Sequence, residues 1–96
     1  MKIIIIGLGL IGGSIAKALS SAQDYEILAF DSDQQSIKNA LHNQSIQGSL
    51  NSLNDLESTE YSDSLVIIST PPSVTNDILK SSDFLFLVTY MLYVYI

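Results

Sequence analysis

The chain has 96 residues and a net charge of −6, so it can form one small domain at most. Its four basic residues are all lysines, which argues against a nucleic-acid partner, because phosphate backbones are bound by clustered Lys and Arg. The absence of cysteine excludes disulfides and thiol catalysis and fits a reducing cytoplasm. A hydrophobic content of 47% with 15% charged residues predicts a globular core.

The start of the chain carries its most specific pattern. The β-branched run Ile3–Ile6 is typical of a central parallel strand that is buried on both faces. It leads directly into a glycine-rich turn and then into a helix. Gly7 would make the turn, Gly9 would let the backbone approach a pyrophosphate, and Gly12 would let the helix pack closely on the strand. Because the free N–H groups of such a helix attract phosphate, the pattern predicts a dinucleotide site.

The helix after this turn shows an amphipathic pattern. Its predicted inner face comprises Ile11, Ile15, Ala18, Leu19 and Ala22, and Lys17 falls outside that face. A secretory signal peptide is the alternative interpretation of this apolar start. The clustered glycines, the lysine within the segment and the acid that follows favour the nucleotide site.

Asp31 follows a short predicted strand, Glu26–Phe30, and lies 19 positions after Gly12. A carboxylate there can accept hydrogen bonds from both hydroxyls of an adenosine ribose, and it repels a 2′-phosphate. With no arginine to bind that phosphate, the sequence favours NAD over NADP. The alternative role for this acid is a helix cap or a solvated loop.

The middle of the chain is expected to hold shorter elements. Residues 32–35 resemble a capping box that opens a second helix, whose apolar face would be Ile37, Ala40 and Leu41. The polar stretch Asn43–Asp63 is expected to contain an edge strand near Ile46 and a helical turn with Leu50, Leu53 and Leu56.

A second buried parallel strand is predicted at Ser64–Ser69, beside Ile3–Ile6. A third helix would then be capped by Ser73 and run to about Ser81, with Val74, Ile78 and Leu79 facing inward. Thr70 and Pro71, between this strand and this helix, would line the crevice where the strand order reverses. The alternative is a rigid turn without a ligand.

These patterns predict cofactor contacts but neither a catalytic nor a metal-binding residue. His42 is expected at the surface, and the carboxylates of residues 55–63 lack metal-ligand spacing. The predicted cofactor-binding residues are Gly7, Gly9, Leu10, Ile11, Gly12, Asp31, Thr70 and Pro71.

The last segment, residues 83–96, is an apolar tail that differs from the domain predicted over residues 1–82. It is too short for a membrane-spanning helix, so no membrane partner is expected. Phe84–Tyr90 would form one added strand, or the tail is the product of a truncation or a frameshift; the exposed apolar content favours the second interpretation.

The segment Ile3–Leu19, with its Gly12-Gly13-Ser14 sequence, resembles the N-terminus of prephenate dehydrogenases, which are NAD-dependent enzymes of tyrosine biosynthesis. Val66–Pro72 is similar to the segment of that family beside the cofactor. The resemblance covers about residues 1–81. It implies an α/β fold, a partial Rossmann-type doubly wound parallel sheet that is truncated before the helical substrate domain. It also implies an enzyme that converts prephenate to 4-hydroxyphenylpyruvate by oxidative decarboxylation.

By the same resemblance, a histidine and an arginine that act on the substrate, and the family's dimer interface, would lie in segments that these residues do not contain. Prephenate or arogenate would therefore bind only to a full-length form, and this chain alone is expected to be inactive. Related glycine-rich starts occur in 6-phosphogluconate and 3-hydroxyacyl-CoA dehydrogenases. The alternatives are a stand-alone NAD- or nucleotide-binding module, a fragment of another NAD-dependent dehydrogenase, and an unstable fragment without function.

Overall fold

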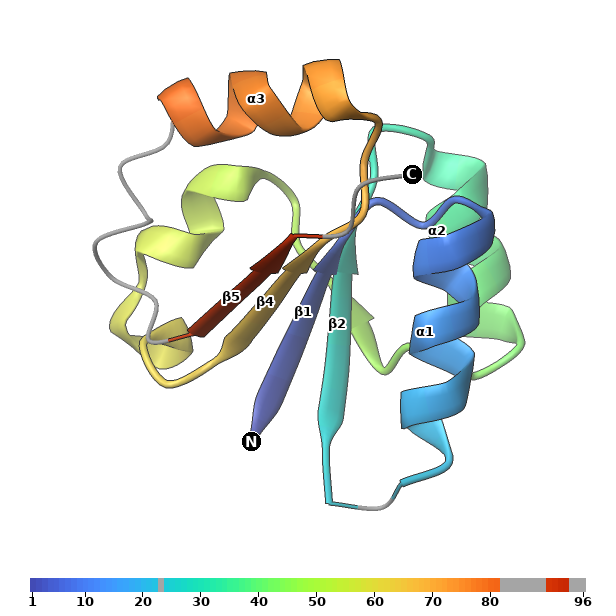
Figure 1. Cartoon of the computed structure of the whole chain (residues 1–96). Coiled ribbons are helices and arrows are strands. Elements are labelled where there is room, and N and C mark those ends of the chain that lie inside the picture. The colour runs from blue at the N-terminus through green and yellow to red at the C-terminus, as the bar shows by residue number, and fades with distance from the viewer. Residues whose placement is uncertain (23, 82–89, 94–96) are drawn as a thin grey trace.

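The computed structural model describes residues 1–22, 24–81 and 90–93. Strands and helices alternate along the chain (Figure 1). In chain order the elements are β1 (Lys2–Ile6), α1 (Leu10–Ser20), β2 (Glu26–Phe30), α2 (Gln34–His42), β3 (Gly48–Ser49), the 3₁₀ helices η1 (Leu53–Glu57) and η2 (Thr59–Tyr61), β4 (Leu65–Ile68), α3 (Pro72–Ser81) and β5 (Tyr90–Tyr93).

The strands form one parallel sheet in the order β3-β2-β1-β4-β5. Ile6 at the end of β1 pairs with Phe30 of β2 on one side and with Ile68 of β4 on the other. Because all strands run the same way, the loops after these three residues meet at one edge of the sheet. The α/β fold and the doubly wound parallel sheet predicted from the sequence are confirmed.

The core lies on both faces of β1, as the run of isoleucines predicts. Ile3 and Ile5 belong to a buried cluster with residues of α1 and α2, whereas Ile4 and Ile6 belong to a second cluster with residues of η1 and α3. Figure 1 shows α1 and α2 on one side of the sheet and α3 with the 3₁₀ helices on the other. Each face of the central strand is therefore covered by helices from a different part of the chain.

The inner face of α1 differs from the predicted one. Ala16 is fully buried and Gly12 is buried, while Ile15 and Leu19 pack partly against the core. Ala18 is exposed, which corrects its prediction as an inward residue. It lies two positions from Ala16, and two positions along a helix turn a side chain by about 200°.

The start of α2 also differs from the prediction. Asp33 is the N-cap, and its side chain accepts a hydrogen bond of 3.1 Å from the backbone N–H of Gln35. The predicted opening by Ser32 is therefore wrong by one residue. Ile37 and Ala40 are buried as expected, but Leu41 is 40% exposed.

The segment between α2 and β4 is ordered, as its length predicts. The edge strand is β3, which begins two residues after Ile46 and pairs with β2. Leu56 on η1 is fully buried and Leu53 packs against the same cluster, so the predicted helical turn is present, but it begins at Leu53 and leaves Leu50 outside it. Ile46 itself is buried, as is Leu50.

The third helix begins earlier than predicted. It starts at Pro72, so Ser73 lies inside it instead of capping it. Ile78 is buried, but Val74 is 42% exposed and Thr75 takes the fully buried position. After α3, most of the strand predicted at Phe84–Tyr90 lies outside the described residues. Within them, β5 pairs in parallel with β4, in the register of Leu65 with Tyr90. None of the helices in the described part of the chain combines the length and apolar character that crossing a membrane requires.

Candidate functional site

Gly7 makes the turn between β1 and α1. Its φ of +99° lies in the region that L side chains rarely adopt. A Cβ atom at this position would also lie 2.9 Å from Cγ2 of Thr70 and 3.0 Å from the carbonyl oxygen of Ser69. Both the backbone conformation and the lack of space therefore require glycine, and the turn predicted from the sequence is present.

Gly12 has no room for a side chain, whereas Gly9 does. A Cβ atom on Gly12 would overlap the carbonyl oxygen of Gly7 and lie 2.5 Å from Oγ of Ser69. The close packing predicted for Gly12 is thus confirmed. At Gly9, no atom lies within 4 Å of the position that a Cβ would take. This backbone borders open space, which a ligand can enter.

The N-terminus of α1 is suited to an anion. Gly9 is the N-cap, so no side chain caps the helix, and the first turn contains no acidic residue. The amide groups there and the positive end of the helix dipole favour a negatively charged group. Leu10 is 90% exposed, so the structure does not bring its side chain to the other predicted residues. Ile11 is partly buried. The backbone N–H groups of both residues lie in the first turn of α1, where a phosphate would bind.

Asp31 lies beside the glycine-rich turn, although it is 23 positions from Leu8 in the sequence. Its Oδ2 accepts a hydrogen bond of 2.7 Å from the backbone N–H of Leu8, and its Oδ1 accepts one of 2.8 Å from the N–H of Asp33. Each oxygen keeps lone-pair capacity for a further donor. The carboxylate is therefore held in place at the end of β2 and can still accept hydrogen bonds.

Thr70 and Pro71 lie across the turn from Asp31. The hydroxyl of Thr70 is 2.7 Å from the hydroxyl of Thr75, and Thr75 also donates to the carbonyl oxygen of Thr70 over 3.1 Å. Pro71 is exposed, and its carbonyl oxygen accepts the N–H of Thr75 over 2.9 Å. The loop after β4 is thus fixed to the first turn of α3, which fits the rigid-turn interpretation. Pro71 in this loop remains accessible to a ligand.

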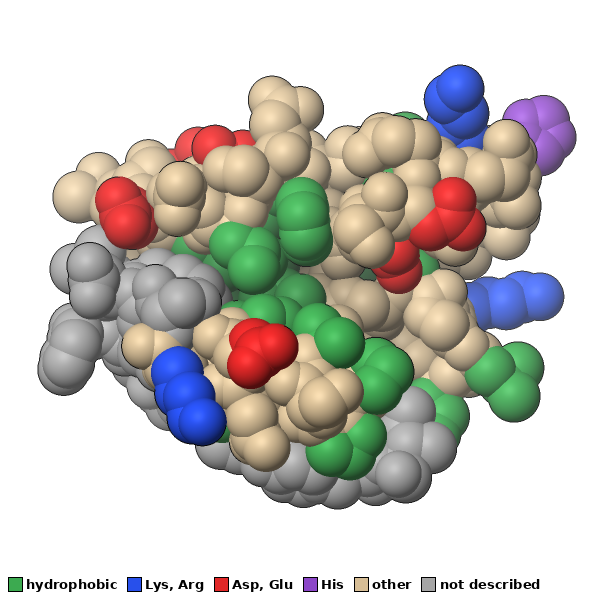
Figure 2. Space-filling model, turned by 90° about the horizontal axis from the view of Figure 1, so that it is seen from above, with side chains coloured by type: hydrophobic (Ala, Val, Ile, Leu, Met, Phe, Trp, Pro, Cys, Tyr) green, Lys and Arg blue, Asp and Glu red, His purple; other side chains and the backbone are tan. Residues whose placement is uncertain are grey.

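A cavity of about 170 Å³ lies between Asp31, after β2, and Thr70, after β4. Its lining combines the glycine-rich turn and Asp31 with apolar side chains that include Phe30, Val74 and Ile78. Figure 2 views the molecule from the edge at which the strands end and shows hydrophobic side chains across the centre with acidic ones around them. The partial exposure of Val74 is explained by its place in this lining.

Three residues that shape the site were not among those predicted from the sequence: Leu8, Ser69 and Thr75. The N–H of Leu8 binds Asp31, and Ser69, which is 4% exposed, donates from its hydroxyl to the carbonyl oxygen of Gly7 over 2.7 Å. Thr75 is fully buried behind Thr70. The sequence offers one signal for each hydroxyl residue. Ser69 directly follows a buried strand, and Thr75 lies in the first turn of a helix.

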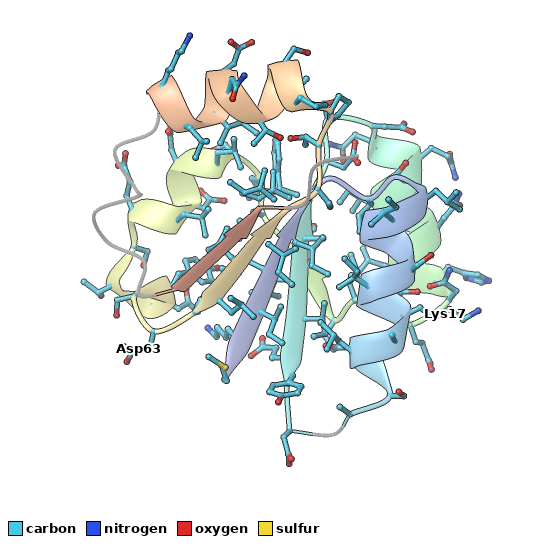
Figure 3. The ribbon with its side chains drawn as sticks, viewed as in Figure 1. Lys17 and Asp63 are labelled. Atoms are coloured by element: carbon cyan, nitrogen blue, oxygen red, sulfur yellow. The ribbon has the colours of Figure 1, made fainter. Side chains whose placement is uncertain are left out.

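Four other charged residues lie away from this edge: Lys2, Lys17, Glu60 and Asp63. Lys17 points outward from α1, and Asp63 lies in the loop before β4, at the opposite end of that strand (Figure 3). Near that end, Lys2 forms an ion pair of 2.9 Å with Glu60 and lies 5.1 Å from the ring centroid of Tyr61. The hydrogen bond to Glu60 raises the pKa of Lys2, and burial raises the pKa of Tyr61.

The arrangement is similar to that of a solved dehydrogenase. The crystal structure of prephenate dehydrogenase from A. aeolicus in complex with hydroxyphenyl propionate and NAD⁺ matches this fold with a TM-score of 0.80 and 25% sequence identity. The match covers 99% of this chain and 33% of that chain, so this chain spans about a third of the length of that enzyme. No curated protein matches the sequence significantly.

The TrkA-N domain family matches residues 3–81, a range that extends from β1 to the end of α3 and includes the whole glycine-rich turn, Asp31 and Thr70. This range is most of the chain. The chain therefore belongs to the TrkA-N domain family, a Rossmann-type domain that binds NAD(H).

Proposed function

We propose that this chain is the N-terminal cofactor-binding part of an NAD-dependent prephenate dehydrogenase and that it is inactive alone. The observation that carries the proposal is the position of Asp31, whose carboxylate is held by the N–H of Leu8 next to the glycine-rich turn. The resemblance of Ile3–Leu19 and Val66–Pro72 to that family supports the choice of enzyme. The likeness to the A. aeolicus enzyme supports it as well.

The carboxylate of Asp31 would bind the adenosine ribose. Its oxygens each accept one backbone N–H and can each accept one ribose hydroxyl in addition. A phosphate on the 2′ position would bring negative charge against this carboxylate, and the described residues place no lysine in the cavity lining to offset it. These features support NAD over NADP.

The glycine-rich turn would bind the pyrophosphate. The space beside Gly9 admits the phosphates, and the N-terminus of α1 offers N–H groups with no acidic residue nearby in its first turn. Gly12 contributes by keeping α1 close to the turn, since a larger residue would push the helix away from Gly7. The 170 Å³ cavity between Asp31 and Thr70 would take the adenine side of the cofactor.

When bound, the nicotinamide group supplies the hydride acceptor of the reaction. The residues of this chain bind and orient the cofactor, and those that act on prephenate or arogenate would belong to segments outside it. The proposal places the module in the cytoplasm, in line with the lack of cysteine.

A calorimetric titration with NADH tests the cofactor site. Asp31→Asn is expected to weaken binding by roughly ten- to a hundredfold, because hydrogen bonds to a charged group contribute about 1.5–3 kcal/mol. The control is Asp63→Asn, which makes the same change of charge at the other end of β4 and should leave binding unchanged. Equal affinities for all three proteins would refute the role of Asp31.

A chimera tests the choice of enzyme. Residues 1–81 would replace the corresponding N-terminal part of the A. aeolicus prephenate dehydrogenase, and NADH formation from NAD⁺ and prephenate would be followed by absorbance. We expect activity that depends on Asp31. A chimera that binds NADH but leaves prephenate unchanged would favour the alternative, an NAD-binding module or a part of another dehydrogenase.

A further inference from the structure

The peptide group between Gly7 and Leu8 is held at both ends by side chains from the two neighbouring strands. Its carbonyl oxygen accepts a hydrogen bond of 2.7 Å from Oγ of Ser69, directly after β4. Its N–H donates one of 2.7 Å to Oδ2 of Asp31, directly after β2. A single peptide plane therefore connects Ser69 to the carboxylate that faces the cofactor site.

The hydroxyl of Ser69 has little freedom to leave this position. The N–H of Ser69 donates to the carbonyl oxygen of Ile6 over 2.9 Å, which fixes the serine backbone against the end of β1. Its hydroxyl is buried and also lies 3.3 Å from the same oxygen of Ile6. Gly12 closes the remaining side, since a Cβ there would lie 2.5 Å from Oγ. A water molecule from the solvent therefore has little access to the Gly7 carbonyl oxygen that the Ser69 hydroxyl binds.

The orientation of this peptide group decides what Asp31 meets. In the observed orientation an N–H donor faces the carboxylate. A rotated peptide would present its carbonyl oxygen, which would repel the carboxylate. Rotation is easiest next to a glycine because glycine adopts many backbone conformations, and Gly7 already has a φ of +99°. A hydrogen bond to the carbonyl is therefore needed on the other side to keep the N–H directed at Asp31.

We propose that Ser69 is a positioning residue for the cofactor: through the Gly7–Leu8 peptide it holds the carboxylate of Asp31 in the orientation that binds the ribose. This inference rests on the proposed function for the ribose contact, but the connection between Ser69 and the amide of Leu8 exists without a ligand. Ser69 itself does not touch the cofactor in this proposal.

The first experiment is amide hydrogen exchange on the full chain without ligand. Ser69→Ala is expected to speed exchange at Leu8 by roughly three- to tenfold, which corresponds to the net loss of one hydrogen bond. The matched control is Ser64→Ala, which removes a buried hydroxyl just before the same strand and should leave Leu8 unchanged. Unchanged exchange at Leu8 in Ser69→Ala would overturn the proposal, whatever the chain binds.

The second experiment measures ribose recognition by titrating NADH and its analogue that lacks the adenosine 2′-hydroxyl. The wild type should prefer NADH by roughly tenfold, and Ser69→Ala should reduce that preference to about twofold. Ser69→Thr, which keeps the hydroxyl, should restore it. A Ser69→Ala protein that binds both compounds more weakly but keeps the full preference would show a purely structural role and overturn the proposal.

The two experiments separate this inference from the proposed function. A wild type that binds neither compound would refute the proposed function and with it the ribose role of Ser69, while the exchange at Leu8 would still report whether the two residues are connected. Should Ser69→Ala fail to fold, Ser69→Cys replaces it in both measurements, because a thiol has a similar shape and is a weak donor. The same exchange and preference results are expected for it.

Discussion

Gly12 packs its backbone against the carbonyl oxygen of Gly7 with no space for a Cβ atom between them. This contact joins the first helix to the turn that precedes it. The four glycines of the segment therefore differ in what they require. Gly7 requires both a positive φ and the absence of a Cβ atom, Gly12 requires the absence of a Cβ atom, and Gly9 leaves open space that a ligand can enter. Gly13 requires neither a positive φ nor the absence of a Cβ atom. Substitutions of Gly12, Gly9 and Gly13 test three of these four cases.

Gly12→Ala is expected to lower the free energy of unfolding by about 3 kcal/mol, because overpacking of this kind displaces the backbone. The added methyl group meets the Gly7 carbonyl, which belongs to the backbone and cannot rotate away as a side chain would. Urea unfolding followed by circular dichroism measures the change. A variant as stable as the wild type would mean that α1 can move outward at no cost.

Gly9→Ala is expected to leave the fold intact and to impair ligand binding. The φ of −69° and ψ of −165° at Gly9 suit alanine, and the space around the added methyl group is open. The change in stability should stay within about 1 kcal/mol, since alanine is a poorer N-cap than glycine. The affinity for NADH should fall at least about tenfold, a loss of roughly 1.4 kcal/mol. Unimpaired binding would show that the phosphates do not approach Gly9.

Gly13→Ala is expected to stabilise the chain by about 0.5–1 kcal/mol, because glycine inside a helix is less favourable than alanine. The new Cβ would lie 3.7 Å from the carbonyl oxygen of Leu8, which is an ordinary contact distance. A thermal melt should show a higher midpoint. A lower midpoint would indicate that the close packing at Gly12 extends one residue further along α1.

The stability of the chain should depend on Tyr61 at alkaline pH. Burial raises the pKa of this phenol above its ordinary value of 10.0, and Glu60 raises it further. Because the folded state holds the proton more tightly than the unfolded state does, ionisation costs stability as the pH rises from 10 through the raised pKa. The raised pKa of Lys2 acts in the same direction.

Urea unfolding at pH 8 and pH 11 checks this dependence. Tyr61→Phe cannot ionise at this position, so the variant should lose less stability between the two pH values than the wild type. Lys2 and its ion pair with Glu60 are present in both proteins. Parallel losses in the two proteins would contradict the prediction.

The strands and the glycine turn could be predicted from the sequence because their signals are local. The run Ile3–Ile6 has no polar interruption, and the bounds of β2 are those read from Glu26–Phe30. Gly7 and Gly12 follow from the same pattern, since only glycine fits a tight turn or a close contact. The fold class followed from these segments.

The helix faces were less predictable, because each depends on the direction in which a helix lies over the sheet. Ala16 and Ala18 are the same residue type, and only the contact of α1 with the sheet decides which one is buried. Leu41 is apolar but exposed, because it is turned by about 100° around α2 from Ala40, which is buried. Thr75 is polar but buried, because the hydroxyl of Thr70 gives it a hydrogen-bond partner.

The connection of Leu8 with Asp31 and of Gly7 with Ser69 could not be found from the sequence. These residues are separated by 23 and 62 positions and come together only when β2 and β4 pair with β1. A backbone N–H and a carbonyl oxygen carry no sequence signal, because every residue except proline has both. The side chains of the site could thus be proposed, but not how the backbone links them.

The central place of β1 has a consequence for biosynthesis. This strand leaves the ribosome before the other described strands, yet its second partner is complete only after Ile68 has been added. Until then, one side of a tetra-isoleucine strand has nothing to pair with, and such an open edge invites association with other chains. Nascent chains arrested between β2 and β4 should consequently aggregate or recruit chaperones more than those arrested after β4.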